Sequence, residues 1–155
     1  MIVPQIEPAT INDFKALAPL IIEFEQFLKA EHGEKPMSPK EIQRSKRYLK
    51  KYLAYDTCLY LLWKQSEKIL GYTFLSIDDK NHNLGFINEL FVVTEKRQKG
   101  IAFKLMEQSL SWFKEKKCDK VQLTVNRENK VANKLYEKIG FRFHESDYID
   151  MQIKV

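Results

Sequence analysis

The chain has 155 residues, of which 44% are hydrophobic and 30% are charged, and its formal net charge at pH 7 is +5. This length and balance indicate one globular domain, residues 1–155, and exclude an intrinsically disordered chain. No run of residues approaches the roughly 18 consecutive apolar residues of a membrane span, and no secretory signal opens the chain. We therefore expect a cytoplasmic protein without a membrane partner.

The N-terminal third predicts one short strand and two helices. We expect a strand over residues 2–7, and apolar residues at three- and four-residue spacing predict an amphipathic helix over residues 10–31. Pro19 removes a backbone donor within this run, so a kink or a split is expected there. A capping box formed by Ser38 and Glu41, with Pro39 at the first helical position, predicts a second helix to about residue 55.

The second helix is strongly basic. Opposed by Glu41 alone, its positive residues are Lys40, Arg44, Lys46, Arg47, Lys50 and Lys51. Such a face suits a polyanion, so a nucleic-acid-binding protein is one alternative for this chain. However, no aromatic residues lie between the basic ones on that face and no nucleic-acid motif is present, which favours a solvated face.

The rest of the chain alternates strands and helices. Strands are expected over residues 57–64, 69–78, 85–93 and 120–126, helices over residues 103–117 and 129–139, and a closing pair of strands over residues 141–144 and 148–155. The strand, helix and strand that run from residue 85 to residue 126 require parallel pairing with a right-handed crossover. The predicted order is β-α-α-β-β-β-α-β-α-β-β.

The turn after the strand over residues 85–93 is a candidate anion site. It contains Arg97, Gly100 and Ala102 and leads directly into a helix. Unpaired backbone N–H groups at such a helix start suit phosphate oxygens. One glycine alone does not make a nucleotide fingerprint, so a bland surface turn is the alternative for this segment taken by itself.

A second segment, residues 129–141, favours the anion-site interpretation of this turn. Its sequence, Asn-Lys-Val-Ala-Asn-Lys-Leu-Tyr-Glu-Lys-Ile-Gly-Phe, matches a family pattern Asn-x-x-Ala-x-x-Leu-Tyr-Glu-Lys-x-Gly-Phe at every position. Arg97, Gly100 and Ala102 match the same family's phosphate-loop pattern Arg/Gln-x-x-Gly-x-Gly/Ala. The chain thus resembles the GNAT superfamily of N-acetyltransferases. The resemblance implies a mixed α/β fold: a mostly antiparallel, twisted sheet of about seven strands with one splayed parallel pair, flanked by about four helices.

The resemblance also implies acetyl-CoA as co-substrate and a set of residues that bind it. In that family, backbone groups of the strand before the loop bind the pantetheine arm, and amides of the loop and of the following helix bind the pyrophosphate. The positions that correspond here are Leu90, Phe91, Val92, Arg97, Gln98, Lys99, Gly100, Ile101, Ala102 and Phe103. Asn126 and Asn129 would line the opening for the arm, although an asparagine at either position could also cap the final helix.

Two residues are expected to carry the chemistry. The family uses the tyrosine at position Tyr136 to protonate the leaving thiolate, and several members place a carboxylate near Glu89 to act as a base through water. The amine must lose a proton before it attacks, which makes a base useful. The alternatives are a core aromatic residue for Tyr136 and a solvent-facing polar residue for Glu89. No cysteine or serine lies in the motifs, so the acetyl group is expected to pass directly to the amine in a ternary complex.

The acceptor is an unidentified amine, of a small molecule or a protein. In this superfamily, acceptor sites are built from the first two helices, their connecting loop and the final strands. Residues 32–37 and 144–147 are therefore the expected walls, and Glu34, Glu145 and Asp147 could attract a cation. A regulator that binds acyl-CoA without catalysis is a further alternative, against which the intact Tyr136 argues.

Neither a metal nor a redox site is expected. Cys58 and Cys118 lack the spacing of zinc or redox pairs, and His32, His82 and His144 are scattered along the chain. A homodimer is expected through the last strand, whose alternating Ile149, Met151, Ile153 and Val155 would let two copies pair or pack across a two-fold axis. An ordinary edge strand is the alternative.

Overall fold

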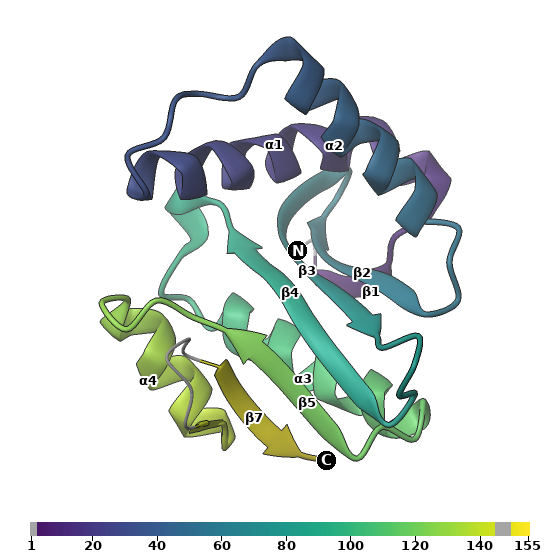
Figure 1. Ribbon diagram of the computed structural model, residues 1–155. Helices are drawn as coiled ribbons and strands as arrows, with labels where there is room; N and C mark the ends of the chain where they lie inside the picture. The colour runs from purple at the N-terminus through teal and green to yellow at the C-terminus, as the bar shows by residue number, and fades with distance from the viewer. Residues whose placement is uncertain (1–2, 145–149) are drawn as a thin grey trace.

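A computed structural model describes residues 3–144 and 150–155 (Figure 1). Its strands are β1 (Gln5–Pro8), β2 (Cys58–Gln65), β3 (Lys68–Ile77), β4 (Leu84–Val92), β5 (Lys120–Thr124), β6 (Arg142–Phe143) and β7 (Asp150–Lys154). Its helices are α1 (Phe14–Glu31), α2 (Pro39–Tyr52), α3 (Ile101–Glu115) and α4 (Lys130–Ile139), with the 3₁₀ turns η1 (Ile11–Asp13) and η2 (Thr94–Lys96). The predicted order of elements is confirmed.

The seven strands form one sheet in the order β1-β2-β3-β4-β5-β7-β6. All neighbours are antiparallel except β4 and β5, which run parallel and are joined through α3. This mixed, mostly antiparallel sheet with one parallel pair is the fold class expected from the sequence.

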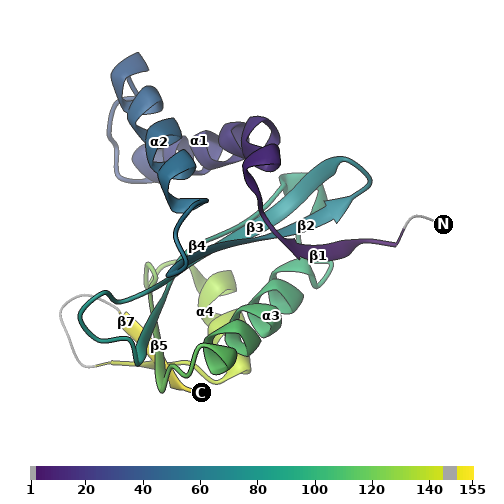
Figure 2. The same ribbon diagram turned by 90° about the vertical axis from the view of Figure 1, so that its right-hand side faces the viewer.

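The helices cover the two faces of the sheet in pairs. Helices α1 and α2 lie on one face, and α3 and α4 lie on the other (Figure 2). Each pair packs on its own hydrophobic core: Leu17, Ile21 and Leu49 belong to the α1/α2 core, and Leu105 and Phe113 belong to the α3/α4 core. The two cores are separated by the sheet, so side chains on opposite faces of one strand enter different environments.

The first two helices are present as predicted, but their bounds differ from the predicted ones. The helical stretch is interrupted at Asp13, where η1 gives way to α1, whereas α1 runs through Pro19 without a split. The capping box at Ser38 is confirmed, because its hydroxyl accepts from Glu41 N and Glu41 Oε2 accepts from Ser38 N at 2.7 Å. Helix α2 ends at Tyr52, three residues before the predicted end.

The last strand is not an edge of the sheet. Strand β7 pairs with β5 on one side and with β6 on the other, so the edge of the sheet is the two-residue strand β6. Met151 is fully buried in the α3/α4 core, and Ile153 and Val155 pack against that core. The alternative of an ordinary edge strand is therefore wrong for β7, and Met151, Ile153 and Val155 contribute to this chain's own core. The homodimer stays a prediction, and Ile149 lies outside the described residues.

Candidate active site

Strands β4 and β5 separate partway along their length. Their parallel register covers only Leu84 to Ile87 of β4, opposite Lys120 to Leu123 of β5. Beyond these residues the two strands diverge toward their C-terminal ends (Figure 1). Within the described residues, the second half of β4 therefore keeps β3 as a neighbour and has an opening on its other side.

The hydrogen-bond alternation of β4 decides which backbone groups face this opening. The amide of Val93 donates to Leu70 O at 2.9 Å, so Phe91 is the next residue whose backbone groups point toward β3. Leu90 and Val92, in the positions between, direct their N–H and C=O groups toward the opening. The structure thus brings Leu90 and Val92 to the opening, while the backbone of Phe91 is directed to β3.

A β-bulge decides the orientation of Glu89. Leu75 of β3 pairs with Ile87, but Phe74 pairs with Glu89, so Asn88 is an extra residue in β4. Residues two apart in a strand normally share a face, and the bulge breaks that rule here. Ile87 enters the α3/α4 core, whereas Glu89 and its partner Phe74 lie on the α1/α2 face.

The environment of Glu89 raises its pKa. Burial is the main cause and the negative charge of Glu25 adds to it, while a hydrogen bond from Tyr72 acts in the opposite direction; the resulting pKa is about 7. The Tyr72 hydroxyl donates to Glu89 Oε2 at 2.6 Å. A carboxyl group with this pKa is partly ionised at neutral pH and can accept a proton there.

The loop after β4 forms a cradle of backbone N–H groups. Gln98 and Gly100 both have left-handed backbone conformations, with φ of 58° and 81°. No side chain caps α3, and its first intrahelical bond runs from Lys104 N to Gly100 O. The preceding amides of Ile101 and Ala102 are therefore without intrahelical partners and suit an anion.

Two glycines shape the space around the cradle. A Cβ on Gly100 would meet no atom within 4 Å, so the loop borders open space at this point. A Cβ on Gly71 of β3 would lie 3.0 Å from Phe91 O and 3.4 Å from Ile101 Cγ2. Gly71 thus allows the start of α3 to approach β3 and β4 closely, which holds the cradle beside the opening.

The basic residues of the loop differ in their roles. Arg97 Nε donates to Val92 O at 2.9 Å, and its guanidinium group lies 5.9 Å from the centre of the Phe91 ring. Arg97 therefore ties the loop to the end of β4, whereas Lys99 is exposed. Phe103 is half-buried under Lys138 of α4, whose Nζ lies 5.1 Å from the ring centre.

The two asparagines before α4 hold the β5–α4 turn. Asn126 Oδ1 accepts from Glu128 N at 2.9 Å, and Asn129 Oδ1 caps α4 by accepting from Ala132 N at 3.1 Å. The capping role that the sequence left open for Asn129 is therefore present. Both side chains are exposed at the end of β5, on the other side of the opening from β4.

Tyr136 lies on α4 with its ring against Phe141, 6.0 Å between ring centres. Burial raises the pKa of Tyr136 to about 12, so its hydroxyl is protonated at neutral pH. In the part of the chain that the structure describes, this hydroxyl has no hydrogen-bond partner. Tyr136 therefore keeps a proton that its hydroxyl can donate.

Three residues that surround Glu89 were not predicted from the sequence. Tyr72 bonds Glu89, Tyr60 lies nearby on β2, and Glu25 reaches the same face from α1. Alternation within each strand could have placed the two tyrosines on one face, but their closeness to Glu89 depends on the register across three strands. No local pattern marks Glu25.

The expected acceptor walls are only partly described. Glu34 forms an ion pair with Lys29 at 3.3 Å, so it is already matched with a cation. Glu145 and Asp147 lie outside the described residues. His144 is exposed at the end of the described segment.

The described residues show neither a grouping of His, Cys, Asp or Glu side chains fit for a metal ion nor a helix long and apolar enough to cross a membrane. Cys58 and Cys118 are free, and burial raises the pKa of both thiols. Cys58 is half-buried and Cys118 is buried, as the sequence indicated.

Comparisons with known proteins agree with this geometry. The model of the acetyltransferase (GNAT) family matches residues 23–141. An uncharacterized N-acetyltransferase of Bacillus subtilis, YhfO, is 24% identical over 141 residues, which are 88% of each chain. The chloroplastic GCN5-related N-acetyltransferase 6 of Arabidopsis thaliana is 31% identical over 81 residues, 52% of this chain and 28% of that protein.

The fold is shared with solved structures. The PaiA N-acetyltransferase of Thermoplasma acidophilum, solved in complex with coenzyme A, superposes with a TM-score of 0.80 at 22% identity over 99% of both chains. The splayed β4/β5 pair and the cradle at the start of α3 agree with the family match, which covers most of the sequence. The chain belongs to the acetyltransferase (GNAT) family and is an acyltransferase.

Proposed function

We propose that this protein transfers the acetyl group of acetyl-CoA to a primary amine by direct attack in a ternary complex. The observation that carries the proposal is Glu89, a carboxyl group with a pKa of about 7 on the strand that borders the opening. Burial and the β-bulge at Asn88 give it both the proton affinity and the direction that a general base needs.

The described residues fit the co-substrate. The amides of Ile101, Ala102 and Phe103 would hold the pyrophosphate at the start of α3, with the partial positive charge of the helix end beneath it. The backbone groups of Leu90 and Val92 would bind the amides of the pantetheine arm, which carries the acetyl thioester when bound. Arg97 would act mainly by fixing the loop, since its Nε already bonds Val92 O.

The reaction moves protons at the amine and at the sulfur. An ammonium group with a pKa near ~10.4 must first become a neutral amine, which costs about 4 to 5 kcal/mol at pH 7. Glu89 would receive that proton, directly or through a water, before the nitrogen forms its bond to the carbonyl carbon. As the carbon–sulfur bond breaks, the Tyr136 hydroxyl would donate its proton to the leaving sulfur, and a backbone N–H of β4 would stabilise the thioester oxygen. The second proton, which the nitrogen loses on becoming an amide nitrogen, would return through water to the Tyr136 oxygen.

Direct attack is supported by the positions of the thiols. Cys118 Sγ donates to His82 O at 3.6 Å, where the β3–β4 and α3–β5 connections meet, at the end of α3 opposite the cradle. Cys58 begins β2, two strands away from β4. Neither thiol borders the opening, so neither is placed to carry the acetyl group.

The first test is calorimetric binding of acetyl-CoA to the wild type and to Gly100→Trp, followed by thiol release with a panel of amines. The indole would extend into the open space beside Gly100, so we expect micromolar binding to the wild type and none to the variant. Gly100→Ala is the matched control, since it shares the backbone strain without the bulk. A folded wild-type protein that binds no acetyl-CoA would refute the proposal.

A further inference from the structure

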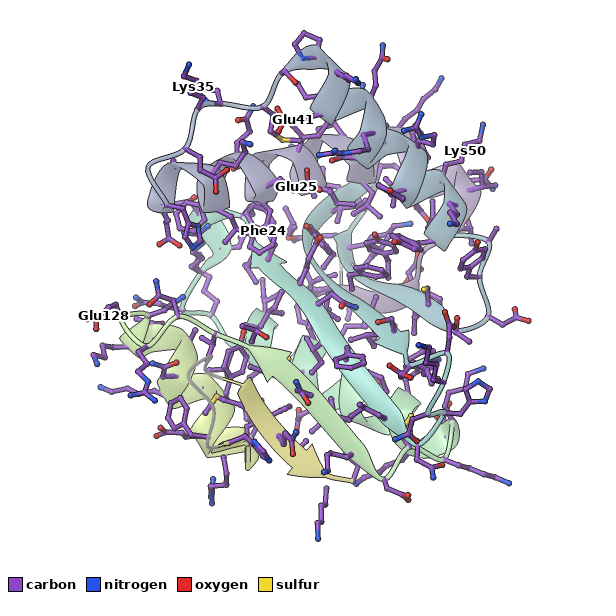
Figure 3. All side chains as sticks on the ribbon, in the orientation of Figure 1. Phe24, Glu25, Lys35, Glu41, Lys50 and Glu128 are labelled. Carbon is purple, nitrogen blue, oxygen red and sulfur yellow. The ribbon has the colours of Figure 1, made fainter. Side chains whose placement is uncertain are left out.

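Helix α2 presents a row of positive side chains to solvent. Four exposed basic residues recur at four- and three-residue spacing and therefore lie along one side of the helix: Lys40, Arg44, Arg47 and Lys51. We call these four residues the basic stripe. At 1.5 Å per residue it extends about 16 Å along the helix. Lys50, just beside the stripe, is also exposed and points away from the molecule (Figure 3).

The fold leaves the basic stripe without a neutralising carboxylate. The acidic residue of α2 is Glu41, whose Oε2 accepts from Ser38 N at the helix cap and whose Oε1 pairs with Lys29 of α1 at 2.9 Å. Glu41 therefore serves the cap and α1. In the described part of the chain, ion pairs involve Lys29 and Lys64, and none involves a residue of the stripe. Its positive potential is thus available to a polyanion.

A column of aromatic rings ends beside the basic stripe. Tyr48 is 45% exposed, and its ring stacks on Tyr52 with 5.9 Å between the ring centres and 12° between the planes. The column continues inward from Tyr52 to Phe74 and then to Tyr60, with ring centres 5.2 and 4.3 Å apart. We expected no aromatic residue beside the basic ones, and Tyr48 corrects that expectation. The buried rings support Tyr48 from one side, so its exposed part can stack with a further ring.

We infer that α2 binds single-stranded nucleic acid, with one base stacked on Tyr48 and the neighbouring phosphates on Arg44 and Lys51. These two residues lie four positions before and three positions after Tyr48, so both flank it on the helix surface. A positive surface that follows the backbone, together with an aromatic ring for a base, is how proteins bind single strands. The inference goes beyond the proposed function, because it uses no residue of the opening between β4 and β5.

Other polyanions fit this face less well. A helix that binds a membrane surface inserts its apolar side into the lipid, but Leu49 of α2 is 2% exposed and Tyr52 and Leu53 pack in the α1/α2 core. A nucleic-acid duplex supplies phosphates, but its bases are stacked on one another. An acidic peptide would neutralise the basic stripe without supplying a base to stack on Tyr48.

Fluorescence anisotropy with labelled strands of about 12 nucleotides tests the inference. The set contains RNA and DNA single strands of one mixed sequence, the duplex of that sequence, and an abasic strand with the same number of phosphates. We expect a micromolar Kd for the single strands at about 50 mM salt, and at least about fivefold weaker binding of the duplex and of the abasic strand. Four phosphate contacts predict a slope near −3 for log affinity against log salt, or about 50-fold weaker binding at about 200 mM salt.

Variants separate the charge from the stacking. Arg44→Gln combined with Arg47→Gln removes two cations, so the salt slope should become shallower by about 1.4 for every strand. Tyr48→Leu should weaken the single strands about fivefold or more and leave the abasic strand unchanged, whereas Tyr48→Phe should bind as the wild type does. The matched control for charge is Lys68→Gln combined with Lys114→Gln, at exposed positions of β3 and α3.

Four results would overturn the inference. Equal weakening by the control pair would assign the binding to net charge, and a Tyr48→Leu variant that binds all strands as the wild type does would remove the stacked base. Displacement of the strand by excess CoA would place it in the cradle at the start of α3. Binding to phosphatidylserine vesicles without binding to the strands would assign the face to a membrane.

Each of these measurements reports binding to α2 and none depends on thiol release. A failure of the proposed acetyl transfer would therefore leave the inference standing, and a failure of the inference would leave the proposed transfer untouched. Denaturant unfolding of each variant shows whether it is folded, and Tyr48→Phe keeps the column of rings, so it serves as the folded reference for Tyr48→Leu.

Discussion

Replacing Glu89 with glutamine should separate catalysis from stability. The folded protein holds this carboxyl group in a place that disfavours its charge, mainly through burial and also through the charge of Glu25. Glutamine has nearly the same shape and no charge. We therefore expect a variant that loses activity and gains stability at alkaline pH.

The magnitude follows from linkage between protonation and folding. The pKa of Glu89 rises from 4.5 to about 7 on folding. Between these values the folded state binds more protons than the unfolded state, so stability decreases as pH rises through the window. At about 1.36 kcal/mol per unit, the penalty reaches about 3 kcal/mol above pH 7 and is under about 1 kcal/mol at pH 5.

The variant should recover most of that difference. Glutamine still accepts from Tyr72, but a bond to a neutral acceptor is weaker than one to a carboxylate, which removes about 1 kcal/mol of the gain. We expect Glu89→Gln to be more stable than the wild type by about 2 kcal/mol at pH 8 and nearly equal to it at pH 5. Denaturant unfolding at the two pH values measures this, with the exposed Glu107→Gln as control.

Activity should change in the opposite direction. General bases typically contribute a factor of about 10² to 10⁴, so kcat should fall at least about a hundredfold, with the acid limb near pH 7 lost. Acetyl-CoA affinity should stay the same, because the cradle is untouched. Thiol release between pH 5.5 and 9 measures these quantities. A variant that keeps the acid limb, or that is less stable than the wild type at pH 8, would refute the reasoning.

Three further results are expected. Tyr72→Phe removes a hydrogen bond that lowers the pKa of Glu89, so the acid limb of the pH–rate profile should move to higher pH; a shift to lower pH would contradict the arrangement. Tyr136→Phe keeps the contact with the neighbouring ring and removes the proton donor, so kcat should fall about tenfold or more with an unchanged Kd for acetyl-CoA; equal kcat values would assign the tyrosine to packing alone. Ser38→Ala breaks the capping box of α2 and should lower the free energy of unfolding by about 1 kcal/mol, and restoring the cap with Ser38→Asp should return it in the same denaturant titration.

Much of the fold could be predicted from the sequence because its signals are local. The capping box at Ser38 and the alternation of Val121, Leu123 and Val125 depend on neighbours within a few residues. Each produced the expected element, with ends displaced by two or three residues. The paired motifs around Gly100 and Tyr136 then identified the family, since their spacing reflects the strand and helix between them.

The orientation of Glu89 could not be predicted in this way. It depends on Asn88, an extra residue that becomes visible only when β4 is aligned with β3. The neighbours of β7 are another case, because the alternation of apolar residues in a strand is the same whether its partner is β6 or another copy of the chain. Both questions concern pairing between distant segments, for which a single strand carries no information.

The divergence of β4 and β5 also has a consequence for how the protein behaves in storage and in crowded solution. An unpaired strand edge usually occurs at the border of a sheet, where it can recruit strands from other molecules. Here the edge lies between the fourth and fifth strands of a seven-stranded sheet, and Arg97 covers one of its carbonyl groups. A bound pantetheine arm would close the remainder, so acetyl-CoA should raise the temperature at which the protein begins to aggregate, even where unfolding of the rest is unaffected.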